Sequence, residues 1–115
     1  MSRNLAYKDL EVWQRAVQFA VDVIDLVESI STGRKHYRLF EQIEASSSSV
    51  PMNIAEGKGR FSKKEFTQYL YISRGSLYET LTVLEIFYRK GWAEMYAWSF
   101  FLSEIHCFPP SFSFL

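Results

Sequence analysis

The segment over residues 51–66 constrains the fold of this chain most, because it contains a helix end, a basic turn and a helix start. Gly57 and Gly59 are helix-stop signals, and lysines and an arginine follow them closely. Ser62 followed three residues later by Glu65 is a capping box, which predicts the first turn of a new helix. Two helices are therefore expected to meet at a short basic turn.

A strongly apolar helix is expected before this segment, over residues 10–30, with Asp9 as its N-cap. Its apolar residues fall into two stripes, and together these cover roughly twice the width of about 100° that an ordinary surface helix needs. Either this helix is central in its own bundle, or one stripe faces the core and the other faces a second copy of the chain. We expect the second arrangement. The candidate interface positions on this helix are Val12, Phe19, Val23 and Leu26.

Three further helices are expected, over residues 37–56, 63–90 and 92–105, followed by an irregular tail over 107–115. Serines 46–49 leave open a linker within the second helix, but the helical phase of the apolar residues on both sides favours continuity. Short connections make sequential helices antiparallel neighbours. The chain is therefore predicted to be one all-α domain, residues 1–115, with an up-down-up-down four-helix bundle. The two prolines of the tail leave open whether the fourth helix is short or incomplete.

Composition limits the classes of function. The 115 residues carry 13 basic and 13 acidic side chains, whereas a protein that grips nucleic acid along its whole surface is strongly basic. A local basic patch stays open. The single cysteine, the lack of an apolar leader and the lack of a long apolar run predict a cytoplasmic protein without a membrane span.

No catalytic constellation is recognisable. Glu56 has no histidine or second carboxylate beside it in the pattern, so it is a poor general acid or base. His36, His106 and Cys107 are too few for a zinc site, which needs three or four ligands, unless subunits share one. We expect a protein that is not an enzyme and needs no cofactor or metal. Pro51, Asn53, Glu56 and Gly57 are assigned a structural role in the helix that holds them.

Basic residues gather at the two ends of the predicted bundle. The candidates for nucleic-acid binding are Lys58, Arg60, Lys63 and Lys64 at one end, and Arg34, Lys35 and Arg38 at the other. Such clusters can neutralise phosphates, although lysines are also common in any solvated turn. Tyr71, Arg74 and Tyr78 share one side of the third helix. These residue types suit base stacking or a protein interface, and we favour the interface.

Four segments carry a family resemblance: DLEVWQRA at 9–16, VPMNIAEG at 50–57, SKKEF at 62–66 and RGSLYE at 74–79. In this order and spacing the chain resembles the four-helix-bundle proteins encoded by 23S ribosomal RNA intervening sequences. The resemblance implies a homo-oligomeric ring, commonly a pentamer. It also implies kinship with the accessory protein of diversity-generating retroelements, a nucleic-acid-binding bundle that works with a reverse transcriptase. Residues 42–51 depart from the family pattern, since they lack the two arginines usual there.

The resulting hypothesis is a non-enzymatic, self-associating four-helix bundle that serves as an accessory or scaffold. It would bind RNA or DNA weakly and without sequence preference through its basic turns. The alternative is a purely structural homo-oligomer or protein-interaction module with no nucleic-acid partner.

Overall fold

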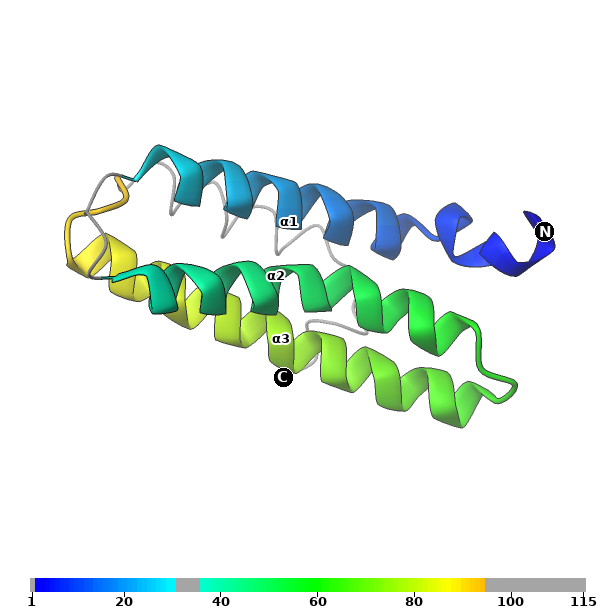
Figure 1. The fold of residues 1–115 in the computed structure, drawn as a ribbon. Helices are drawn as coiled ribbons and strands as arrows, with labels where there is room; N and C mark the ends of the chain where they lie inside the picture. Colours follow the sequence, from blue (N-terminus) through cyan, green and yellow to red (C-terminus); the bar gives the residue numbers. More distant parts are fainter. Residues whose placement is uncertain (1, 31–35, 95–115) are drawn as a thin grey trace.

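The computed structural model describes residues 2–30 and 36–94. They form a 3-10 segment, η1 (Ser2–Asp9), and the helices α1 (Glu11–Ser29), α2 (Tyr37–Lys58) and α3 (Lys63–Arg89). The helices run side by side and alternate in direction, with α2 between α1 and α3 (Figure 1). No strand occurs in these two stretches, and the all-α prediction is confirmed. Residues 95–115, which include most of the predicted fourth helix and the whole tail, lie outside the described residues.

The core lies between the helices and includes Phe19, Ile43, Ile54, Leu77 and Phe87, each fully buried. Because α1 supplies Phe19 and Val23 to this core, the prediction that these two residues contact a second subunit is wrong. Val12 and Leu26 are partly buried and pack against the same core. The apolar stripe of α1 that we expected to face a second copy of the chain therefore faces the core of its own chain.

The start of α1 also differs from the prediction. Asp9 is still part of η1, and the N-cap residue is Leu10, whose side chain makes no capping hydrogen bond. The Leu10 backbone N–H instead donates to the Tyr7 carbonyl at 3.1 Å, and Gln14 Nε2 donates to the Lys8 carbonyl at 2.8 Å. The junction therefore depends on hydrogen bonds to the 3-10 segment and not on an aspartate cap.

Small polar side chains join α2 to α3 along the serine run. The hydroxyls of Ser46 and Thr80 lie 2.7 Å apart and are buried, and Ser73 Oγ donates to the Val50 carbonyl at 2.7 Å. One turn away, Ser49 Oγ and Ser76 Oγ lie 2.9 Å apart. Serines are modest helix formers, so these contacts to α3 help to explain why α2 continues through them. We call this set of residues the serine seam.

Gly57 marks the closest approach of α2 and α3. It is buried inside α2, which continues to Lys58, two residues beyond the predicted end, and Gly57 is therefore not the helix stop. A Cβ at this position would lie 2.5 Å from Tyr69 Cβ and 3.0 Å from Phe66 Cδ1. The absence of a side chain at residue 57 is what lets α3 come this near.

Both ends of α3 agree with the sequence prediction. Ser62 is its N-cap and accepts a hydrogen bond from the Glu65 N–H at 3.1 Å. At the other end Gly91 has φ of 77°, and the Trp92 N–H donates to the Phe87 carbonyl at 2.8 Å. This is a Schellman motif, in which a glycine in the left-handed region ends the helix.

Two glycine substitutions separate close packing from helix propensity. We expect Gly57→Ala to destabilise the protein by about 1–3 kcal/mol, because its methyl group would overlap Tyr69. Gly75→Ala, within α3 and with no atom inside 4 Å of the new Cβ, should stabilise it by about 0.5–1 kcal/mol. Urea denaturation followed by circular dichroism measures both values. Equal effects of the two substitutions would contradict the close approach at residue 57.

Candidate nucleic-acid interface

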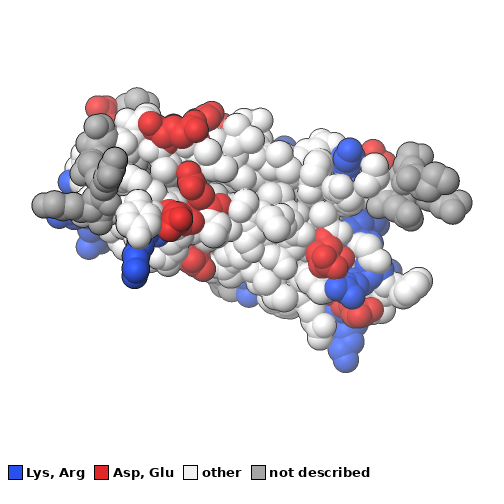
Figure 2. Space-filling model, in the orientation of Figure 1, with Lys and Arg blue, Asp and Glu red and all other residues white. Residues whose placement is uncertain are grey.

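The α2–α3 turn brings together three of the predicted basic residues. Lys58 ends α2, and Lys63 and Lys64 begin α3, all three with exposed side chains. Figure 2 shows Lys and Arg side chains at the end of the molecule where α2 meets α3, with some acidic side chains among them. The ion pairs found among the described residues involve Arg15, Arg60 and Arg89, and none of the three lysines. We call Lys58, Lys63 and Lys64 the basic turn.

Arg60, the fourth candidate at this end, is held by its neighbours. One of its guanidinium nitrogens lies 2.8 Å from a Glu56 carboxylate oxygen and donates to the Tyr69 hydroxyl at 2.6 Å. The guanidinium also lies over the Tyr69 ring, 5.0 Å from its centroid. The charge of Arg60 is thus largely balanced by Glu56, and its role here is to hold the turn against α3.

Phe61 lies at the tip of this turn, and the sequence reasoning did not single it out. Its side chain is fully exposed, at 106%. The residues on either side are both anchored, Arg60 through Glu56 and Tyr69, and Ser62 as the N-cap of α3. The available signal was an apolar residue inside a basic turn, outside the periodic pattern of either helix.

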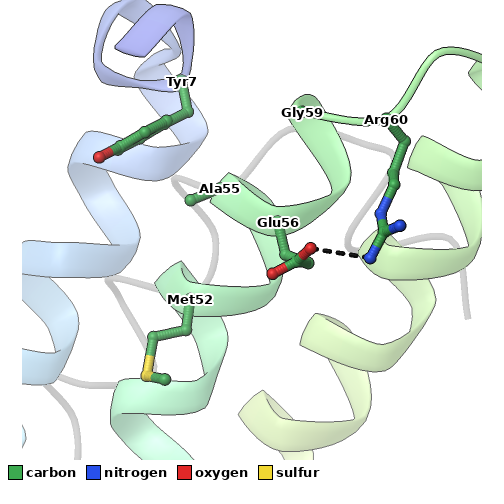
Figure 3. Close-up of a pocket in the computed structure, with 6 residues that line it drawn as sticks. All are labelled: Tyr7, Met52, Ala55, Glu56, Gly59 and Arg60. Atoms are coloured by element: carbon green, nitrogen blue, oxygen red, sulfur yellow. Dashed lines mark hydrogen bonds and ion pairs between the residues drawn. The ribbon is translucent and has the colours of Figure 1, made fainter. Parts of the chain in front are cut away.

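A shallow hollow of about 520 Å³ lies beside the turn, lined by Tyr7, Met52, Ala55, Glu56, Gly59 and Arg60. Tyr7 closes it from η1, and the Glu56–Arg60 ion pair forms its opposite side (Figure 3). Among the described residues that line the hollow there is no serine, cysteine or histidine that could act as a nucleophile or base with Glu56. These residues give the hollow an amphipathic surface.

The predicted basic cluster at the opposite end is only partly described. Arg38 is exposed in the first turn of α2, whereas Arg34 and Lys35 lie outside the described residues. Arg89, the last residue of α3 at this same end, pairs with Glu85 at 2.8 Å. Lys90 is exposed at the C-cap of α3.

The remaining candidates lie on α2 and α3. Pro51 is buried within α2, and Asn53 Nδ2 donates to the Ser49 carbonyl at 2.9 Å and to the Ser49 hydroxyl at 2.8 Å. On α3 the Arg74 guanidinium lies 4.8 Å from the centroid of the exposed Tyr71 ring. Tyr78 is half-buried. An interface role for Tyr71, Arg74 and Tyr78 stays a prediction.

The described residues contain no group of three or more His, Cys, Asp or Glu side chains placed to hold a metal ion. Over the same stretches, no helix combines the length and the apolar character that crossing a membrane requires.

The chain matches the model of a protein family. The family model described as "23S rRNA-intervening sequence protein" matches residues 8–106. This range spans α1, the serine seam, the basic turn and α3. No curated protein matches the chain.

Proposed function

The chain belongs to the 23S rRNA-intervening sequence protein family, and we propose that it is a non-enzymatic accessory protein that holds nucleic-acid phosphates at the basic turn. The observation that carries this proposal is the exposure of Lys58, Lys63 and Lys64 without ion-pair partners among the described acidic residues. All three are exposed, lie together at one end, and take part in no ion pair with a described acidic residue.

The chemistry of these residues sets the character of the binding. A lysine ammonium is a compact point charge that contacts phosphate without reading base edges, so binding is independent of sequence. Each phosphate that is neutralised releases condensed counterions, so affinity falls as salt rises. Because the whole chain has a formal charge of zero, binding stays confined to this end and is weak.

Charge reversal at the two ends of the bundle tests the proposal. We expect Lys63→Glu with Lys64→Glu to weaken binding of RNA and DNA alike, and to reduce the slope of log affinity against log salt by about 2. The matched control is Arg38→Glu with Lys90→Glu, which makes the same change of charge at the opposite end. Fluorescence anisotropy at several salt concentrations measures the affinities.

Equal weakening by both pairs would contradict the assignment to the basic turn, because either net charge alone would control binding or the cluster around Arg38 would bind as well. Absence of binding by the unmodified protein at about 50 mM salt would leave only the alternative of a structural oligomer without a nucleic-acid partner.

A second observation favours self-association. Each helix has an uncharged stretch, over residues 16–21 in α1, 45–55 in α2 and 66–73 in α3. The stretches of α1 and α2 lie near the middle of their helices, and that of α3 lies in its first half. The middle of the face drawn in Figure 2 accordingly carries almost no acidic or basic side chains. We call these three stretches the uncharged band.

The uncharged band exposes large apolar side chains, namely Val21, Met52 and Ile72, with Met52 at 65%. Exposed apolar residues in stretches without charges are typical of protein interfaces, and a second copy of the chain offers the same residues. We propose that copies associate through this band. A ring of such copies, a pentamer as the family resemblance implies, would repeat the basic turn once in each subunit.

One added charge tests the band. We expect Met52→Lys, and separately Ile72→Glu, to give the mass of a single chain, because each would leave an unpaired charge buried between copies. Tyr37→Glu, at a residue that is 57% exposed but outside the band, is the control and should leave the assembly intact. Light scattering coupled to gel filtration gives the masses. A mass of one chain for the unmodified protein would contradict self-association.

A further inference from the structure

The full exposure of the Phe61 ring has no explanation in the contacts around it. A phenylalanine side chain gains free energy when its surface leaves water, yet this ring is fully exposed at 106%. Among the described residues, the Phe61 ring makes no contact with another aromatic ring or with a cation. The ring therefore has its whole surface available for a ligand.

The backbone on both sides of Phe61 is fixed. Arg60 is tied to Glu56 at 2.8 Å and to Tyr69 at 2.6 Å, and Ser62 caps α3 through the Glu65 N–H. The tip of the turn is thus built between two anchors, which lowers the entropy that a bound ligand must remove. Arg60 acts here as a positioning residue for the ring.

Three lysines lie close to Phe61 in the sequence, together with the acidic residues Glu56 and Glu65. Lys63 and Lys64 follow Phe61 by two and three residues, and Lys58 precedes it by three, all exposed. The N-terminus of α3 is already occupied by the Ser62 cap, and Glu65 lies in its first turn. A phosphate at this tip would therefore be held by the lysine side chains.

We propose that Phe61 stacks on one unpaired base of a single-stranded nucleic acid while the basic turn neutralises the flanking phosphates. This inference rests on the proposed function and names its substrate class as unpaired strands. One exposed ring offers one stacking platform, which is the unit that single-strand binding uses for each base. A duplex keeps its base faces stacked inside, so Phe61 adds nothing to duplex binding.

An anionic membrane is the competing ligand for a turn that combines lysines and an aromatic ring. Membrane insertion by such a turn needs enough apolar area to enter the interface. The neighbours of Phe61 at the tip are Gly59, Arg60 and Ser62, which add little apolar surface. A single ring thus suits a base better than a lipid surface.

The experiment compares Phe61→Ala with the unmodified full-length chain on three labelled probes of equal phosphate number. The probes are an oligothymidylate, an abasic single strand and a duplex, each titrated at about 50 mM salt. We expect Phe61→Ala to lower affinity for the oligothymidylate about tenfold. Affinity for the abasic strand and the duplex should change less than about twofold, since neither offers a free base face.

Three variants make the result specific. Phe61→Trp keeps an aromatic platform and should retain oligothymidylate binding. Tyr37→Ala removes an exposed aromatic ring at the opposite end and should have no effect. Lys63→Glu with Lys64→Glu should weaken binding of all three probes. Circular dichroism confirms that each variant keeps its helices.

The outcomes distinguish the two proposals. If Phe61→Ala leaves oligothymidylate binding unchanged while the lysine reversals weaken it, the stacking inference is overturned and the proposed function stands. If the unmodified chain binds none of the probes, both fall. If Phe61→Ala abolishes binding to vesicles of phosphatidylserine and phosphatidylcholine but leaves the oligothymidylate unaffected, a lipid surface replaces the base as the ligand of this ring.

Discussion

The close contact between α2 and α3 is the constraint on which the rest of the structure depends. Gly57 lets the two helices approach to a distance that no side chain at that position would allow. The serine seam continues the contact with hydrogen bonds between small hydroxyl groups, such as that between Ser46 and Thr80. Because the helices meet so closely, the connection between them is short, and Arg60 can reach both Glu56 on α2 and Tyr69 on α3.

This geometry has a consequence for charge. The chain is neutral as a whole, and much of its positive charge is balanced locally, as in the Arg15–Glu11 and Arg89–Glu85 pairs. At the α2–α3 turn the ion pair with Glu56 balances the charge of Arg60 but not the charges of the lysines. A chain without net charge therefore has three exposed lysines at one end that form no ion pair with a described acidic residue. The uncharged stretches of α2 and α3 end close to this turn, at residues 55 and 66, whereas that of α1 covers residues 16–21.

The sequence predicts those features of the fold that depend on residues close together in the chain. The Ser62 cap, the end of α3 near Gly91 and the all-α class follow from residue types at short spacing, and the structure confirms them. The sequence predicts Gly57 as a helix stop, because a glycine near a helix end has the same pattern whether it ends the helix or lets another helix approach. Only Tyr69, twelve residues later, shows that its task is close packing. Likewise, the two apolar stripes of α1 are equivalent in the sequence, and tertiary packing alone places Phe19 and Val23 in the core. The sequence does not predict the exposure of Phe61, because a single exposed apolar side chain produces no periodic pattern.

Hydrogen exchange followed by mass spectrometry tests most directly whether the serine seam holds α2 and α3 together. The serine run has low intrinsic helix propensity, so its amides are protected only if α3 packs on it. The account predicts that the peptide covering residues 45–57 exchanges among the slowest in the described part of the chain, and far more slowly than residues 59–62 of the turn. Exchange of residues 45–57 as fast as that of the turn would contradict it.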